Sequence, residues 1–319
     1  MSSAGVERTA GTPILSHPAK DERGTLNAGR GIFVPRRWSL FIPPHLLVGG
    51  GLVGLVMLAA LLAPILAPSP PDLVQPALRL QAPTPLHPFG TDPLGRDLFS
   101  RVLYGARIAF QMSALAALLA ALPGTGLGLL AGYHQRWLEQ ILSRLMDAWL
   151  AFPGMLLAIV LVARMGPSLT ATVVALGIVG IPSYYRLVRN GTLSARHALY
   201  VEAARSIGAS EVRILLRHIL PNLASPIIVL TTLRLGMVLL AGGALSFIGL
   251  GAQPPQPEWG ALLANGRGYM DTAWWLALFP GLAITTAVMG FNLLGDGLRD
   301  ALAPDVRSFR WQSQPSRRH

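Results

Sequence analysis

Two aspartates, Asp92 and Asp97, are the first candidates for chemistry in this chain. A pair of carboxyl groups can act as general acid and general base. No activated nucleophile or cofactor motif accompanies them, so a catalytic role lacks its other parts. The alternative is capping and pairing with Arg96 or Arg101, because Asp92 followed by Pro93 is typical of the N-cap and first position of a short helix. We expect this structural role.

Metal and thiol chemistry find little support in the composition. The chain has no cysteine, which excludes a disulfide, a thiol nucleophile and a cysteine-ligated metal. The histidines are scattered over predicted tails and loops, and no two have ligand spacing on one helix. We therefore predict no metal site. The histidines are His17, His45, His87, His134, His197, His218 and His319.

Nucleotide hydrolysis is a third chemistry to consider. Lysine occurs once, as Lys20 in the segment His-Pro-Ala-Lys-Asp. A phosphate-binding P-loop ends in Gly-Lys-Ser/Thr, and this segment does not match it. If ATP drives this protein, another chain must hydrolyse it.

Membrane helices are the elements that must position these residues. Hydrophobic residues make up 52% of the 319 and charged residues only 13%, whereas a soluble domain carries about 25% charged residues. The net charge of +11 could suggest nucleic acid, but the basic residues lie in short segments between apolar runs. Membrane topology explains them better, and no nucleic-acid partner is expected.

Six apolar runs are candidates to cross a hydrocarbon core about 30 Å thick, which takes roughly 20 helical residues. The third is short unless residues 146–150 begin it. Proline and glycine interrupt several runs, and neighbouring helices can accommodate them. The runs are residues 46–67, 108–131, 149–163, 169–188, 224–250 and 274–294.

Arginine and lysine predict the orientation. Residues 1–45 are rich in proline, glycine and charge, without the early apolar stretch of a signal peptide, and we expect a mostly disordered tail. With this tail inside, most basic residues fall in cytoplasmic segments, as the positive-inside rule requires. Both termini and the segment 196–221 are then cytoplasmic.

The pattern of that segment predicts a helical hairpin. Residues 196–207 favour a first helix, which Gly208 can terminate in the left-handed conformation. Ser210 can cap a second helix, and Pro221 is expected to end it. Arg213 and Arg217 lie on a different face from the apolar residues, which predict one buried stripe: Val212, Leu215, Leu216 and Ile219.

The first helix of the hairpin carries the most distinctive spacing. Its sequence Glu-Ala-Ala is followed by glycine three residues later, and by Leu-Pro twelve residues after the glycine. This pattern resembles the cytoplasmic coupling loop of permease subunits of ATP-binding-cassette importers. His218 stands where the family pattern has an aliphatic residue. The resemblance implies contacts with an ATPase by Glu202, Ala203, Ala204, Arg205, Gly208 and Pro221. The small alanines would let the helix lie close in a groove, and Glu202 and Arg205 would add a charged edge suited to orientation.

Further segments are similar to the peptide and nickel branch of these permeases, over about residues 80–305. Three of them are Leu-Ser-Phe-Ile-Gly-Leu-Gly at 245–251, Trp-Gly at 259–260 and Asn-Leu-Leu-Gly-Asp-Gly-Leu-Arg-Asp at 292–300. Gly242 and Gly243 stand where several relatives carry an acid, so any substrate contact of that acid does not transfer. The extracytoplasmic motif lies within residues 87–107 and includes Gly90, Thr91, Asp92, Gly95, Arg96 and Asp97.

The resemblance implies an all-α fold, the transmembrane domain of a type I ABC importer with six transmembrane helices. We expect five regions: a cytoplasmic N-terminal tail (1–45), a first transmembrane helix (46–67), an extracytoplasmic segment (68–107), a core permease domain (108–300) containing the coupling hairpin (196–221), and a cytoplasmic C-terminal tail (301–319).

Polar and small residues inside the runs have two readings. Arg234 is costly in a bilayer, so it either makes a structural ion pair or snorkels to the inner face, or it lines a substrate path with Ser246. Gly124, Gly128 and Gly132 follow the small-xxx-small rule. Packing inside this subunit is the favoured reading, and a face for a second permease is the alternative.

The implied machine has several parts. A second homologous permease would form the path with this chain, two ATPase subunits would bind ATP and magnesium, and an extracytoplasmic solute-binding protein would deliver substrate. The location is a bacterial or archaeal inner membrane, in contact with lipid. Dipeptides or oligopeptides are the expected cargo, with nickel and glutathione as alternatives. The other classes are a stand-alone channel or secondary carrier, which would need carboxylates at mid-membrane, and a membrane enzyme.

Overall fold

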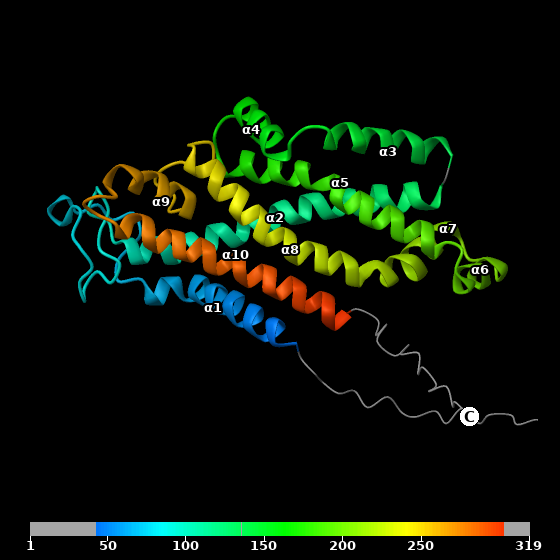
Figure 1. The fold of residues 1–319 in the computed structure, drawn as a ribbon, viewed down its shortest axis with the longest axis horizontal. Coiled ribbons are helices and arrows are strands. Elements are labelled where there is room, and N and C mark those ends of the chain that lie inside the picture. Colours follow the sequence, from blue (N-terminus) through cyan, green and yellow to red (C-terminus); the bar gives the residue numbers. More distant parts are fainter. Residues whose placement is uncertain (1–42, 135, 303–319) are drawn as a thin grey trace, which may run out of the picture. The chain divides into compact units, whose positions relative to one another are not determined.

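The computed structural model describes residues 43–134 and 136–302, and this part of the chain is almost entirely helical (Figure 1). The predicted tails at 1–45 and 301–319 lie, except for their innermost residues, outside the described residues. The prediction of an all-α fold is confirmed. The long helices are α1 (Pro44–Leu66), α2 (Leu98–Tyr133), α5 (Leu169–Ala195), α8 (Leu220–Phe247) and α10 (Trp275–Leu302). Shorter ones are α3 (Trp137–Leu150), α4 (Gly154–Met165), α6 (Leu199–Ser206), α7 (Glu211–Arg213) and α9 (Trp259–Gly266).

Five helices in the described residues are long and apolar enough to cross a membrane, and a bent pair, α3 with α4, brings the number to six. The two helices of the pair meet at 87°. The predicted third span at 149–163 is therefore wrong as one straight helix. Pro153 stands immediately before α4; it has no N–H to continue the ladder and disfavours helical geometry at Phe152.

Helix α2 begins at Leu98, well before the apolar run predicted to start at 108. Its first turns contain Ser100, Arg101 and Arg107, so hydropathy alone does not detect them. The carboxylate of Asp97 caps this start by accepting the backbone N–H of Ser100 at 2.7 Å. Only one isolated bridge, between Thr91 and Asp97, is found in the described residues before it.

Among the described residues, helices α2 and α5 share the most extensive helix contact, and it uses the predicted glycine spacing. A Cβ atom added at Gly124 would lie 2.6 Å from the Tyr184 Cβ, and one added at Gly128 would lie 2.8 Å from the carbonyl oxygen of Tyr185. Gly132 meets Thr192 in the same way. The three glycines therefore serve packing inside this subunit, as favoured from the sequence.

Helix α5 is the most enclosed candidate span. In its most apolar window 61% of the residues are buried, against 28% in α1, α8 and α10. Helix α1 lies along α10 (Figure 1). In this single chain, large apolar faces of α1, α8 and α10 therefore remain uncovered by protein.

Candidate functional site

The hairpin begins with α6, which starts at Leu199, three residues after the predicted start. Its end is as predicted, because Gly208 adopts φ +80°. The N–H of Gly208 bonds to the carbonyl of Arg205, and the N–H of Ala209 bonds to that of Ala204. This pair of bonds is the Schellman motif, which closes a helix end with a left-handed residue.

The two alanines of α6 face opposite ways. Ala203 is exposed together with Glu202 and Arg205, whereas Ala204 is 5% exposed and packs inward beside Val201. The expectation that both alanines form the outer surface is therefore wrong for Ala204. Successive helical residues are about 100° apart, so Ala204 can turn inward while Ala203 stays on the exposed side with Glu202.

The second half of the hairpin departs from a regular α-helix. After α7, residues Ile214–Ile219 form a π-helical segment, η2, in which the Leu220 N–H bonds to the carbonyl of Leu215. The predicted stripe is correct for Leu215 and Ile219 but wrong for Val212 and Leu216, which are 65% and 56% exposed. The wider turn shifts the register, so Ile214 is buried in their place.

Two predicted helix signals act differently from expectation. Ser210 occupies the N-cap position of α7, but its side chain makes no capping hydrogen bond. Pro221 does not end the helix, because η2 continues directly into α8. Pro221 lies in the first turn of α8, where its missing N–H costs little and the preceding π turn relieves the clash with an earlier carbonyl.

A buried cluster fixes the hairpin to the membrane helices. Val201, Ile214 and Ile219 of the hairpin pack with Leu129 of α2 and Val188 of α5. Movement of the hairpin must therefore displace the ends of α2 and α5, since close-packed side chains transmit strain.

The outer surface of the hairpin carries apolar side chains that the described chain leaves uncovered. Leu199 is 84% exposed and Ile207 is 86% exposed, and Val212 and Leu216 add to this surface. We call these four residues the hairpin surface. Exposed charged residues, including Glu202, lie between them in the sequence. Apolar patches rimmed by polar residues are typical of protein-binding sites. Sequence periodicity missed Leu199 and Ile207 because it assigned no face to them.

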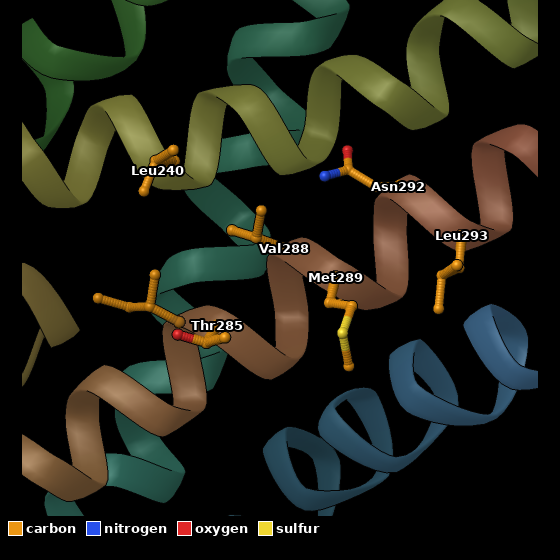
Figure 2. A pocket seen from close by; sticks show the side chains of 7 residues that line it. Leu240, Thr285, Val288, Met289, Asn292 and Leu293 are labelled. Atoms are coloured by element: carbon orange, nitrogen blue, oxygen red, sulfur yellow. The ribbon is translucent and has the colours of Figure 1, made fainter.

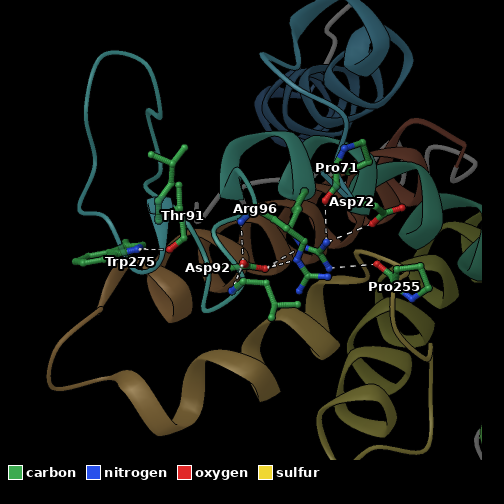
Figure 3. Close-up of polar contacts among 10 residues, drawn as sticks. Pro71, Asp72, Thr91, Asp92, Arg96, Pro255 and Trp275 are labelled. Atoms are coloured by element: carbon green, nitrogen blue, oxygen red, sulfur yellow. Dashed lines mark hydrogen bonds and ion pairs between the residues drawn. The ribbon is translucent and has the colours of Figure 1, made fainter. Parts of the chain in front are cut away.

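The extracytoplasmic motif is a turn held by buried ions (Figure 3). One oxygen of Asp92 accepts the backbone N–H groups of Leu94 and Arg96 at 2.8 and 2.9 Å. The other accepts Nε of Arg96 at 2.6 Å. The predicted pairing with Arg96 is confirmed, but the predicted helix start at Pro93 is wrong, because Gly95 turns the chain at φ +74°. The N-cap role belongs to Asp97.

Arg101 joins this turn to distant segments. It donates to the carbonyl of Pro71 at 2.8 Å and to that of Pro255 at 3.3 Å, and its Nε lies 3.8 Å from Asp92. The indole of Trp275 in α10 donates to the carbonyl of Thr91 at 3.2 Å (Figure 3). Asp92 and Asp97 are thus buried and occupied by structural bonds, which leaves no place for a substrate between them.

The close packing also explains why residue 90 is a glycine. It adopts φ +73°, and a Cβ atom there would lie 2.8 Å from the indole nitrogen of Trp275. Asp97 in turn bonds to Nδ1 of His87 at 2.8 Å. The sequence motif therefore encodes a closely packed platform on α2 and α10.

Arg234 links α8 to α5 through uncharged partners. Its guanidinium donates to the hydroxyl of Ser183 at 2.6 Å and to the carbonyl of Gly180 at 3.2 Å. Among the described residues Arg234 makes no ion pair, so the predicted structural ion pair is not found there. A path-lining role for Arg234 stays a prediction.

Ser246 lies at the end of α8 and is only 2% exposed. Its hydroxyl accepts the backbone N–H of Ala252 at 3.3 Å. Glu258, also 2% exposed, caps α9 by accepting the N–H of Ala261 at 2.9 Å. The path-lining role predicted for Ser246 stays a prediction, and in this structure its side chain is enclosed. Sequence reasoning missed Glu258.

A groove of about 330 Å³ runs between α8 and α10 (Figure 2). Its lining is mostly apolar, with two polar side chains from α10, Thr285 and Asn292. Leu240 of α8 forms the opposite wall (Figure 2). The groove opens on the uncovered faces of these helices.

The comparisons with known proteins agree with these features. Residues 124–308 match the family described as "Binding-protein-dependent transport system inner membrane component". The chain is 47% identical over 262 residues to the dipeptide transport system permease protein DppC of Alkalihalophilus pseudofirmus, covering 81% of this chain and 86% of that protein. It is 46% identical over 273 residues to the glutathione transport system permease protein GsiD of Pectobacterium atrosepticum, covering 85% and 91%.

A further relative is a putative peptide transport system permease protein of Brucella suis, 44% identical over 260 residues, with 82% and 88% covered. Among solved structures, a chain of the MetNI methionine ABC transporter in an inward-facing conformation matches with a TM-score of 0.52 and 17% identity. The match covers 64% of this chain and 97% of that one. At this identity the likeness concerns the fold alone.

Proposed function

Because this chain belongs to the family of binding-protein-dependent transport system inner membrane components, and is a permease subunit of an ABC importer rather than an enzyme, we propose that it carries short peptides inward. The relatives named for dipeptide and peptide transport support this cargo. Glutathione, a tripeptide thiol, is the second candidate, since a glutathione permease is equally similar.

The proposed complex contains a second homologous permease, two ATPase subunits holding ATP and magnesium, and an extracytoplasmic binding protein. The uncovered faces of α8 and α10 are the proposed contact with the second permease, because the groove between them offers space for its side chains. The platform formed by the extracytoplasmic motif is the proposed seat of the binding protein.

The proposed orientation puts both termini and the hairpin in the cytoplasm. The excess of arginine in these segments supports it. The extracytoplasmic motif then lies at the opposite end of α2 from the hairpin, as Figure 1 allows the reader to follow.

The hairpin is the proposed site of coupling, with Glu202, Ala203, Arg205 and Gly208 toward an ATPase. The observation that carries this is its two-sided construction: Ile207 is 86% exposed outside, while Ile214 is 1% exposed against α2 and α5 inside. ATP-driven closure of the ATPases would pull the hairpin and rock the attached helices, which is alternating access. No bond of the cargo is broken.

The test is a charge placed in the hairpin surface of the reconstituted complex. We expect Ile207→Glu to reduce ATPase co-purification and transport at least about tenfold, because a buried unpaired charge costs several kcal/mol at an interface. Leu86→Glu is the matched control for ATPase co-purification, since Leu86 is 79% exposed in the predicted extracytoplasmic segment. Normal ATPase binding and transport by Ile207→Glu would refute the coupling role.

The cargo is tested separately, in vesicles containing the complete complex and its binding protein. Uptake of a labelled dipeptide should be competed by other short peptides. Uptake of labelled glutathione without uptake of the dipeptide would assign the second candidate, and uptake of neither would refute both.

A further inference from the structure

A polar cavity of about 320 Å³ lies between the C-terminal end of α2 and the hairpin. Its walls come from four places in the sequence that only the fold brings together. In contrast to the groove between α8 and α10, every side chain in its lining is polar. The lining residues are Tyr133, His134, Arg196, His197, Arg205 and Glu211.

Two guanidinium groups dominate this cavity. Arg196 donates to Nε2 of His197 at 2.9 Å and to the carbonyl of Tyr133 at 3.5 Å. Arg205 donates to the Tyr133 hydroxyl at 3.4 Å. These are the hydrogen bonds of the two arginines within the described residues. Each guanidinium has five N–H donors in a planar fork, so further donors remain for a ligand.

The charge balance of the cavity favours an anion. Glu211 is the one acid in the lining, and its carboxylate lies 3.8 Å from Nε2 of His134. Within the lining, two permanent positive charges thus face one negative charge, and Glu202 of α6 acts on Arg205 from outside the lining. Guanidinium forks match phosphate oxygens with paired hydrogen bonds. We propose that this cavity binds a phosphate group.

The position of the cavity makes a lipid headgroup one source of that phosphate. It lies at the end of a membrane helix, and Trp137 and Tyr200, which are 69% and 41% exposed, flank it in the sequence. Exposed aromatic side chains are typical of the membrane–water interface, and basic pockets between membrane helices bind anionic lipid headgroups. An anionic phospholipid and a free phosphate present the same chemistry here.

The lipid arm of the test uses native mass spectrometry of the intact importer complex. The complex is incubated with vesicles of phosphatidylglycerol or of phosphatidylcholine, and retained lipids are counted. We expect Arg196→Gln to weaken phosphatidylglycerol retention about tenfold, the loss expected for one charge-assisted hydrogen bond pair. Arg217→Gln is the matched control, an exposed hairpin arginine outside the cavity.

The second arm uses delipidated complex in detergent, titrated with inorganic phosphate against chloride at matched ionic strength. A rise in the thermal unfolding midpoint that Arg196→Gln abolishes, without selective lipid retention, would assign a free phosphate. If Arg196→Gln does not assemble, Arg196→Lys, which keeps the positive charge but loses the planar fork of donors, takes its place. Unchanged binding of both ligands in the variants would overturn the proposal. Neither arm requires ATP hydrolysis, so its result is independent of the coupling role.

Discussion

Arg101 and Glu258 are two buried ionisable residues outside the hairpin, and they differ in the partners that surround their charges. Arg101 is 2% exposed and has carbonyl groups and carboxylates around it. Glu258 is equally buried, but within the described residues its carboxylate has no cation partner. A buried charge without an opposite charge is destabilising. The two residues should therefore respond in opposite ways to neutralisation.

Burial raises the pKa of Glu258 above its ordinary value, although the N–H groups of Gly260 and Ala261 and the Ser246 hydroxyl oppose the shift. The folded state therefore holds this proton more tightly than the unfolded state does. The stability it contributes is complete below the unfolded pKa and is lost as the pH rises through the raised folded pKa.

We expect Glu258→Gln to raise the thermal unfolding midpoint relative to the wild type at about pH 8, with the difference vanishing near pH 4. The glutamine oxygen can still accept the N–H of Ala261, and no charge is buried. Differential scanning fluorimetry of the purified complex measures this. A lower midpoint for Glu258→Gln at both pH values would contradict the argument.

Arg234 gives a test of structure against substrate contact. We expect Arg234→Ala to lower stability by about 1.5–3 kcal/mol, because hydrogen bonds to Ser183 and Gly180 from a charged group are lost. Transport of a peptide and of its C-terminally amidated form should then fall equally. A loss confined to the peptide with a free carboxylate would instead make Arg234 a path-lining residue.

At the scale of elements, the continuity of the hairpin with α8 matters most. Helix α7, the π segment and α8 form one candidate span, Glu211–Phe247. The hairpin is thus a rigid extension of a membrane helix on one side and is packed on α2 and α5 on the other. π-helical segments often occur at functional sites, and this one sets which apolar residues face outward.

The α2–α5 contact provides the sharpest test at this scale. Gly128→Ala should destabilise the protein by about 1–3 kcal/mol, because its Cβ would meet the backbone of α5 at 2.8 Å. Gly126→Ala, two residues earlier, is the control, since nothing lies within 4 Å of its added Cβ. That control should be neutral or slightly stabilising. Equal effects in thermal unfolding would argue against the close contact.

At the scale of the whole molecule, the uncovered helix faces and the two polar ends make this chain one component of an assembly. The platform around Asp92 and Asp97 is buried within the chain, whereas the residues of the hairpin surface are apolar and exposed. This asymmetry suits a permease that is driven from the side of the hairpin.

The chain offers a direct test of its orientation because it contains no cysteine. Single substitutions Leu86→Cys and Ile207→Cys place thiols at positions 79% and 86% exposed. In intact cells with a permeable outer layer, a membrane-impermeant maleimide should label Leu86→Cys, and Ile207→Cys should react only after the membrane is opened. The reverse pattern would invert the topology.

The sequence by itself determined the fold class and the family, and it located the five long apolar helices. These depend on composition, on apolar run length and on local signals, such as Gly208 at a helix end, that act within a few residues. The same local logic placed Gly124, Gly128 and Gly132 in a helix contact inside the subunit.

Only the tertiary structure decided the bend before Pro153, the start of α2 at Leu98 and the outward face of the hairpin. The bend and the early start depend on backbone geometry and capping that hydropathy averages away. The face depends on the π segment, which shifts the register so that Leu216 turns outward and Ile214 inward. The polar cavity of Arg196 and Arg205 joins segments far apart in the chain, and no spacing rule reports a contact that close packing alone creates.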